Sequence, residues 1–344
     1  MTNRTTSYDI ALRVGVGQST VSRALRDDPR ISQATRDKVR AAAAELGYIP
    51  NLTARSLITG SVRAIGVLVP DLLNPMYAQF VESIQEVLAE RDYRMVLLTD
   101  RTEGMRDAGI DVLQGGLVDG TIFMQARSDS DLVDMLASAG HRLVVLGRDI
   151  VTPNAGGVEV DRVVADDAAA GRLAAEHLLA QGNAVFAVVG GTESNPTSNA
   201  REAAFITRLT ELGVADGDIA VHHGAVEAHD GEIVLAAMLD SGAVPDAIFC
   251  TTDFVALGVL QAAAEAGVAV PETLQVMGVG DMYMTGWKAF GLTTIRQPYA
   301  DMSRAAATML LDRIEGQREI TERVVKPVEL VPRGTTALRV VAPS

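Results

Sequence analysis

The chain has 344 residues, with 30 basic and 44 acidic side chains and a formal net charge of −14. Its single cysteine, Cys250, excludes a disulfide framework and a cluster of thiolate metal ligands. No apolar run approaches the roughly 20 residues that span a membrane, and the N-terminus lacks the pattern of a secretion signal. We therefore expect a cytoplasmic protein with no membrane partner.

Charge is divided unevenly along the chain. Residues 1–60 contain nine basic and five acidic side chains, whereas residues 61–344 contain 21 basic and 39 acidic ones. Contacts with phosphates require local positive charge, and an acidic remainder helps solubility and avoids nucleic acid. The division predicts a protein that touches DNA with its N-terminal end only.

The first predicted elements form a helix-turn-helix over residues 7–27. Ala11 is the small residue between two helices, Gly15 is the turn residue, and Val21 and Ala24 are buried. A third helix is predicted over 33–46, where apolar residues recur at a period near 3.6. These three short α-helices indicate a small DNA-binding domain over residues 1–50.

Beyond residue 63, short β-branched runs alternate with amphipathic stretches, a pattern typical of parallel α/β sheets covered on both faces. The runs are 64–70, 94–99, 120–125, 143–147, 184–190, 247–252 and 274–280. Seven such runs are too many for one compact sheet, so they predict an α/β core of two lobes over 61–344. We expect the first lobe at about 61–160 plus 293–324, and the second at about 161–292 plus 325–344. Ligands of open α/β sheets bind beyond the carboxyl ends of the strands, so the sensor site is expected between the lobes.

Other kinds of site have weak support. His222 and His223 are adjacent in a predicted strand and would point to opposite faces, so we expect no metal site there or at His229. No strand is followed by a full G-x-G-x-x-G, and Gly190-Gly191 lacks the lysine of a phosphate-binding loop, so we expect no cofactor. The main hypothesis is a ligand-responsive transcription regulator without enzymatic activity. The alternative is a cytoplasmic solute-binding protein or an enzyme on the same α/β core.

Several ordered motifs resemble the LacI/GalR family of bacterial transcription regulators, over nearly the whole chain. They are YDIA at 8–11, TVSRAL at 20–25, ELGYIPN at 45–51, ARSL at 54–57, IGV at 65–67 and LTTIRQP at 292–298. The resemblance implies a homodimer that binds operator DNA and a periplasmic-binding-protein-like core that senses a small molecule. It also implies a hinge helix within 51–60 whose Leu57 enters a minor-groove base step. Ile58 departs from the basic residue that often follows this leucine.

The resemblance further implies which residues contact DNA. Gln18, Ser19 and Arg23 would read base edges, and arginine is the commonest specific partner of guanine. Contacts with phosphates would come from Thr20, Ser22, Ser32 and Thr35. The remaining expected DNA contacts are Thr5, Ser7, Arg26, Asn51, Ala54, Arg55 and Leu57.

The same resemblance points to an effector site. Arg201 lies where relatives keep an effector-facing arginine, whose fork of donors suits vicinal hydroxyls or a carboxylate. Many relatives have an Asp pair where this chain has Gly280-Asp281, so either Asp281 substitutes for the missing carboxylate or the ligand is of another type. Asp253 is either a helix N-cap or a ligand contact, and Trp287 either stacks on the ligand or packs between lobes. The full expected set is Asn74, Met76, Tyr77, Gln125, Arg148, Arg201, Asp253, Asp281, Trp287 and Gln297. A sugar, polyol or sugar acid is the effector type that the family resemblance implies.

Overall fold

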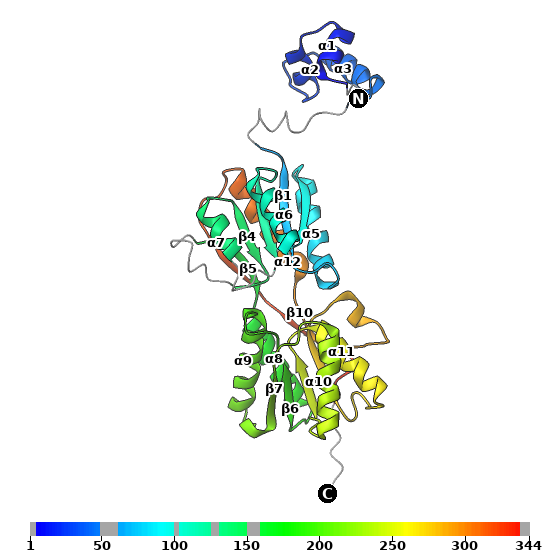
Figure 1. Cartoon of the computed structure of the whole chain (residues 1–344), viewed down its shortest axis with the longest axis vertical. Helices are drawn as coiled ribbons and strands as arrows, with labels where there is room; N and C mark the ends of the chain where they lie inside the picture. The colour runs from blue at the N-terminus through cyan, green and yellow to red at the C-terminus, as the bar shows by residue number, and fades with distance from the viewer. Residues whose placement is uncertain (1–4, 49–60, 100–102, 125–130, 150–158, 338–344) are drawn as a thin grey trace. The chain divides into compact units, whose positions relative to one another are not determined.

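The computed structural model describes residues 5–48, 61–99, 103–124, 131–149 and 159–337. Contacts divide the chain into two units, Met1–Val62 and Arg63–Ser344. Figure 1 shows the elements of both units in chain order. Each unit is described by itself below.

The N-terminal unit consists of three helices, α1 (Ser7–Val14), α2 (Gln18–Ala24) and α3 (Gln33–Glu45). Thr6 and Asp9 form a capping box at the start of α1, which satisfies backbone amides that the helix itself leaves open. Gly15 ends α1 in the left-handed conformation at φ 72°, where glycine carries no steric penalty. Ile10, Val21 and Val39 are fully buried between the three helices. The predicted helix-turn-helix and third helix are thus confirmed.

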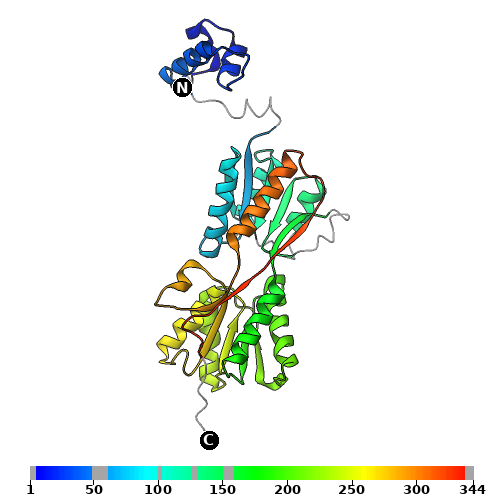
Figure 2. The ribbon, with the colours of Figure 1, turned by 180° about the vertical axis from the view of Figure 1, so that it is seen from behind.

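The second unit contains two six-stranded sheets. In the first sheet the order is β11-β5-β4-β3-β1-β2, and every strand pairing is parallel. Its strands are β1 (Ala64–Val69), β2 (Arg94–Thr99), β3 (Gly120–Met124), β4 (Leu143–Leu146), β5 (Asp161–Ala165) and β11 (Arg323–Lys326). The helices of this first lobe are α5 (Met76–Glu90), α6 (Glu103–Gln114), α7 (Asp131–Ser138) and α12 (Tyr299–Ile314). Figures 1 and 2 show α6 and α7 on one face of the sheet and α5 and α12 on the other.

The second sheet has the order β12-β10-β9-β8-β6-β7, and only the pairing of β10 with β12 is antiparallel. Its strands are β6 (Phe186–Val189), β7 (Ile219–His222), β8 (Ala247–Cys250), β9 (Gln275–Gly280), β10 (Thr293–Arg296) and β12 (Glu329–Val331). The helices of this second lobe are α8 (Asp167–Ala180), α9 (Pro196–Glu211), α10 (Ala228–Ser241) and α11 (Asp253–Glu265). Two 3-10 turns, η1 (Asp216–Asp218) and η2 (Tyr283–Gly286), complete the described elements. Helices α8 and α9 pack on one face, and α10 and α11 pack on the other.

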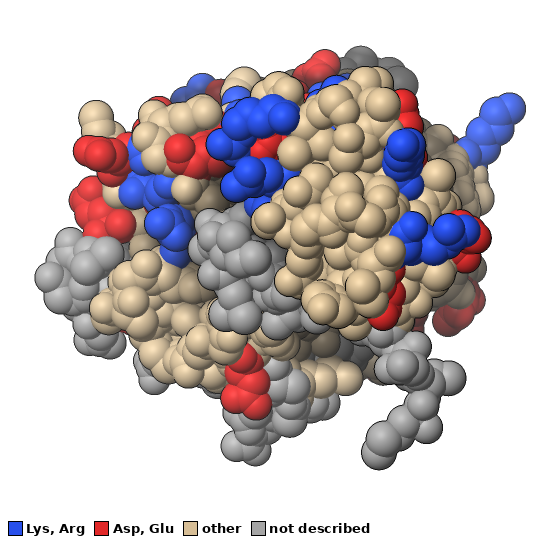
Figure 3. All heavy atoms as spheres, turned by 90° about the horizontal axis from the view of Figure 1, so that it is seen from above, with Lys and Arg blue, Asp and Glu red and all other residues tan. Residues whose placement is uncertain are grey.

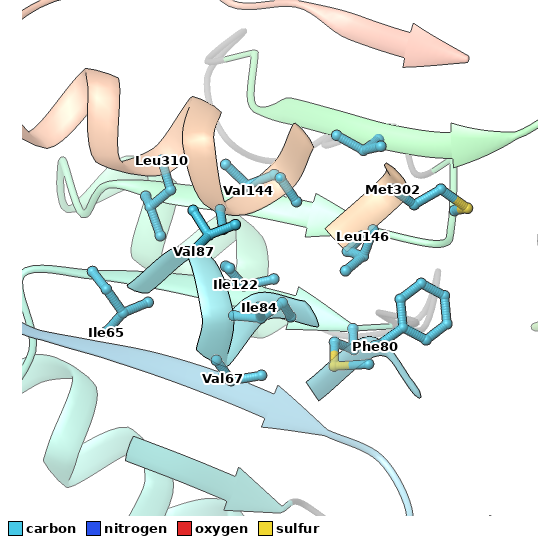
Figure 4. Packing of buried hydrophobic residues seen from close by; sticks show 14 of the residues in the cluster. Ile65, Val67, Phe80, Ile84, Val87, Ile122, Val144, Leu146, Met302 and Leu310 are labelled. Carbon is cyan, nitrogen blue, oxygen red and sulfur yellow. The ribbon is translucent and has the colours of Figure 1, made fainter. Parts of the chain in front are cut away.

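The core of the first lobe shows why the strand runs form a sheet here. Ile65 and Val67 of β1 point to the same side and meet Ile84 of α5 and Leu310 of α12 (Figure 4). Full burial of such a side chain stabilises the fold by about 1.5–3 kcal/mol. The alternating positions of each parallel strand face the second helical layer, so both sides of the run must be apolar.

Three connections join the lobes, and two of them lie elsewhere than the sequence predicted. Residues 161–165, expected in the second lobe, form β5 of the first sheet, and residues 293–296, expected in the first lobe, form β10 of the second. The chain therefore passes between lobes after Ala165, after Arg296 and after Lys326. Sheet membership depends on strand pairing across the chain, which a local apolar run does not encode.

Candidate functional sites

The second helix of the N-terminal unit presents the polar residues that were expected to read DNA. Gln18, Ser19 and Arg23 are exposed, while Val21 and Ala24 of the same helix are fully buried. Gly17 is the N-cap of α2 and makes no side-chain cap bond, as its lack of a side chain requires. One face of this short helix is thus fixed in the core and the other is open to a partner.

Several of the expected contacts are already engaged within the unit. Gln18 Nε2 donates to Ser7 Oγ at 3.0 Å, and the Arg26 guanidinium donates to the Ser22 hydroxyl at 2.7 Å. The Thr5 hydroxyl donates to the carbonyl of Leu46 at 2.9 Å. These bonds orient the side chains before any partner is present.

Ser32 and Thr35 lie together at the start of α3. Ser32 is the N-cap of this helix, and its hydroxyl accepts the backbone amide of Thr35 at 3.3 Å. The two hydroxyl oxygens are 2.8 Å apart, and Ser32 is exposed. Thr20 and Ser22, the other two expected phosphate contacts, are half-buried on α2.

The described arginines of this unit, which lie within residues 5–48, fall into two groups. Arg13, Arg30, Arg36 and Arg40 form ion pairs with Glu45, Asp28 or Asp27. Arg23 and Arg26 of the helix-turn-helix pair with no acidic side chain within residues 5–48 or elsewhere in the described chain. On the face of the chain that Figure 3 shows, basic and acidic side chains lie next to one another.

Five predicted site residues fall outside the described residues. They are Asn51, Ala54, Arg55 and Leu57 of the expected hinge, and Gln125 of the expected effector site. Their roles stay predictions.

A pocket lies where the carboxyl ends of the two sheets meet, as expected for open α/β sheets. Seven of the ten predicted effector residues line it, from both lobes: Asn74, Met76, Tyr77, Arg148, Arg201, Asp253 and Gln297. Thr197 of α9, in the second lobe, links the two lobes, because its hydroxyl donates to the carbonyl of Gly147 of the first lobe at 3.2 Å. The pocket is therefore built from the ends of, or the segments after, β1, β4, β6, β7, β8, β9 and β10.

Arg201 is held rigidly in this pocket. It is 3 % exposed, its Nε donates to Asp167 Oδ1 at 2.8 Å, and its Nη1 donates to the carbonyl of Thr251 at 2.7 Å. Burial raises the pKa of Asp167, and the Arg201 charge acts in the opposite direction. A guanidinium held by these two bonds and by the contact of its Nη2 with Asp167 Oδ1 at 2.8 Å is preorganised to donate to a ligand.

Asp253 also lines the pocket, but its oxygens are already bonded. Oδ1 accepts the Thr294 hydroxyl at 2.5 Å, and Oδ2 accepts the backbone amide of Met282 at 3.0 Å. Burial raises the pKa of Asp253 to about 6, against the lowering effect of these bonds. Thr252, rather than Asp253, is the N-cap of α11.

Asp281 and Trp287 lie outside the pocket. Asp281 forms ion pairs with Arg296, at 2.7 Å, and with Arg333, and so ties the end of β9 to β10 and to the segment after β12. Trp287 is half exposed and contacts Tyr283 edge-on at 5.4 Å between ring centroids. The pairing of Asp281 with Arg333 could not be recognised from the sequence, because the two residues are distant along the chain.

The structure adds several lining residues that the sequence did not indicate. Ser198 of α9 and Thr251 share a hydrogen bond of 2.7 Å, and the Ser198 oxygen also accepts the amide of Gly191 at 2.6 Å. Asn195, the N-cap of α9, and Tyr299, the first residue of α12, lie in the same wall. The only available signal was their place directly after strands or at helix starts.

Among the described residues, no group of three or more His, Cys, Asp or Glu side chains is arranged to hold a metal ion. His223 instead faces Glu202 at 3.4 Å, and His229 faces Glu232 at 3.0 Å. In the same part of the chain, no helix has the length and apolar character needed to cross a membrane.

Comparison with known proteins bears on both sites. Residues 6–51 match the model of bacterial regulatory proteins of the lacI family, and residues 175–336 match that of the periplasmic binding protein-like domain. The HTH-type transcriptional repressor CytR of Escherichia coli strain K12 is 30% identical over 96% of both chains.

Two solved structures are similar over nearly the full length. The lac repressor dimer bound to operator and the anti-inducer ONPF has a TM-score of 0.85 and 28% identity, covering 97% of this chain and 100% of that one. The complex of the transcriptional regulator CelR with cellobiose has a TM-score of 0.74 and 28% identity, covering 96% and 100%. A helix-turn-helix unit followed by a two-lobed core, together with a full-length relative at 30% identity, assigns the chain to the LacI family of bacterial transcription regulators.

Proposed function

We propose that this regulator is a cytoplasmic repressor that binds an operator as a homodimer and releases or tightens its grip when a small molecule enters the pocket. The effector class is a sugar, a polyol or a sugar acid. The single observation that carries the proposal is the pocket itself, in which seven residues predicted from the family resemblance converge from two lobes.

The DNA half of the proposal rests on α2. Its exposed Gln18, Ser19 and Arg23 would read base edges, while Thr20, Ser22, Ser32 and Thr35 would hold phosphates. Arg23 and Arg26 form no ion pair with an acidic side chain of the described residues, although the Arg23 charge helps to lower the pKa of Asp28, so both guanidiniums can contact DNA. The lac repressor, which is similar to this chain over nearly its full length, was solved as a dimer bound to operator. That structure supports dimeric operator binding by the present chain.

The sensing half rests on the three connections between lobes. A ligand that contacts Asn74 and Arg148 of the first lobe and Arg201 of the second stabilises one relative placement of the lobes over others. A ligand with unequal affinity for two states shifts their populations, and this alone suffices for allosteric control. The CelR complex with cellobiose supports a carbohydrate-like ligand in this type of core.

The test of DNA recognition is selection of operator sequences from a random duplex pool by the full chain, followed by binding measurements on the selected site. Arg23→Ala should reduce discrimination against a changed base pair by about 1–3 kcal/mol. Arg13→Ala is the matched control, since Arg13 pairs with Glu45 at 3.0 Å and should leave discrimination unchanged. Selection of no common sequence, or equal discrimination by the Arg23 variant, would contradict the proposal.

A further inference from the structure

The hydroxyl of Tyr299 is an unpartnered donor in the wall of the pocket. Tyr299 is 5 % exposed, its Oη has no hydrogen-bond partner among the described residues, and it lines the pocket. Its ring packs edge-on against Phe80 at 4.6 Å between centroids, which fixes the direction of the phenol. Burying a hydroxyl without a partner costs free energy, so such a group calls for a ligand or a function.

The residue opposite this hydroxyl is Gly280. A Cβ atom built on Gly280 would lie 2.7 Å from Tyr299 Oη and 3.2 Å from Asp253 Oδ2. Gly280 also has φ of +146°, a conformation that residues with side chains rarely adopt. Thus the phenol of Tyr299 occupies the space that a side chain at position 280 would need, and the two residues are a matched pair.

This pairing changes the hydrogen-bonding character of the wall. A carboxylate at position 280 could only accept bonds from ligand hydroxyls, whereas a phenol can also donate one. Asp253 is the single carboxylate among the described lining residues, and its two oxygens already accept from Thr294 and Met282. Beside Gly280, the carboxylate of Asp253 is therefore already engaged, and the hydroxyl of Tyr299 remains to donate to a ligand.

The charges around the pocket favour the same type of ligand. Two guanidiniums, those of Arg148 and Arg201, line it, and that of Arg201 is also paired with Asp167. The first turns of α5, α9, α11 and α12 also contribute lining residues, namely Tyr77, Ser198, Phe254 and Tyr299. Each helix start carries a partial positive charge that attracts anions. The N-cap residues of α5 and α12 are Pro75 and Pro298, which make no side-chain cap bond.

We propose that the effector is a hydroxylated carboxylic acid, and that Tyr299, given room by Gly280, determines this specificity by donating to an acceptor oxygen of the acid. The inference rests on the proposed function and narrows its effector class from sugars, polyols and sugar acids to the acids. Tyr299 acts as a binding residue, and Gly280 acts through the space it leaves.

The experiment compares matched acids and neutral compounds on the full chain by isothermal calorimetry. The pairs are D-gluconate with D-glucitol, D-glucuronate with D-glucose, and D-galacturonate with D-galactose. At least one acid should bind, at least tenfold more tightly than its neutral partner. Equal or tighter binding of the neutral partner, or binding of no acid in the panel, overturns the inference.

Variants of tyrosine test the role of the hydroxyl itself. Tyr299→Phe should weaken binding of that acid by roughly 10-fold to 100-fold, the loss expected for a hydrogen bond to a charged group. Tyr283→Phe is the matched control, because Tyr283 is 62 % exposed and outside the pocket lining. Unchanged affinity in the Tyr299 variant overturns its assignment.

The matched pair is tested by a double-mutant cycle with Gly280→Ala. The added methyl group should weaken acid binding strongly beside Tyr299, and at least threefold less in the Tyr299→Phe background, where the clashing oxygen is absent. Backbone strain at position 280 is present in both backgrounds and cancels in the cycle. Additive effects overturn the pairing.

Operator binding separates this inference from the function on which it rests. A protein that binds its selected operator, and is released or tightened by a neutral sugar, retains the proposed function and loses the inference. A protein that selects no operator loses the proposed function, whatever its preference among acids and neutral compounds.

Discussion

Arg201 is fixed by Asp167, a residue that lies directly after the first connection between the two lobes. Both Nε and Nη2 of Arg201 lie 2.8 Å from Asp167 Oδ1, and the arginine is 3 % exposed. Asp167 is the first residue of α8, which begins after β5 of the first sheet has ended at Ala165. The Arg201 guanidinium, which lines the pocket, is thus bonded to a residue at the first connection between the two lobes.

Breaking this pair should destabilise the core strongly. Asp167→Ala leaves the buried Arg201 without its acidic partner, and the loss of one member of a buried pair costs about 3–5 kcal/mol. Urea unfolding of the full chain measures the loss. Glu176→Ala is the control, since its exposed pair with Arg208 should contribute less than about 1 kcal/mol. Equal costs for the two variants would contradict the prediction.

A milder change should separate sensing from folding. Asp167→Asn keeps an acceptor for Arg201 but removes the charge that holds it, so effector affinity should fall by about tenfold. Operator affinity without effector should stay within about twofold, because Asp167 belongs to the core unit. Calorimetry and fluorescence anisotropy measure the two affinities. A variant that loses operator binding while effector binding persists would contradict this prediction.

The free energy of unfolding should depend on pH through the protonation of Asp253. Its pKa is raised by burial from 3.8 to about 6 in the folded state, so the folded state takes up a proton more readily than the unfolded state. The stabilisation associated with protonation is full below about pH 4 and is lost as pH rises through about 6. Relative to Asp253→Asn, the native protein should lose up to about 3 kcal/mol of unfolding free energy across this window. A difference between the two proteins that is constant from about pH 4 to 7 would contradict the prediction.

Asp281 should act in stability rather than in ligand binding. Its carboxylate is paired with Arg296 and Arg333 and is 10 % exposed. Asp281→Asn should therefore lower the free energy of unfolding by about 2 kcal/mol and leave effector affinity within about twofold. Thermal unfolding and calorimetry on the same preparation test both statements. Loss of effector affinity with unchanged stability would contradict this prediction and indicate that Asp281 contacts the effector.

The helix-turn-helix and most strands were predictable because their signals are local. Gly15 at the turn, Ser32 as the N-cap of α3, and the apolar run of β1 each encode their own conformation through steric preference, capping or periodicity. The family resemblance likewise located Arg201 and Gln297 by their place in short motifs. Such positions need no knowledge of what they meet in space.

The remaining features depend on contacts between distant residues. β5 and β10 were assigned to the wrong lobes because each strand's sheet is decided by its partners, β4 and β11 for the former and β9 and β12 for the latter. Asp281 faces Arg333, and Tyr299 fills the space beside Gly280. The sequence shows that position 280 lacks the carboxylate that many relatives have there. Only the structure shows that the Tyr299 hydroxyl occupies the space beside it.

The most direct test of the account is the affinity of the full chain for its selected operator, measured by fluorescence anisotropy with and without a bound effector from the panel. Allosteric coupling typically changes such an affinity by roughly 5-fold to 150-fold. The account predicts a change of at least fivefold, in either direction, that is abolished by Arg201→Ala while operator binding itself persists. An operator affinity that is the same at saturating effector would contradict it, because the pocket would then be uncoupled from DNA binding.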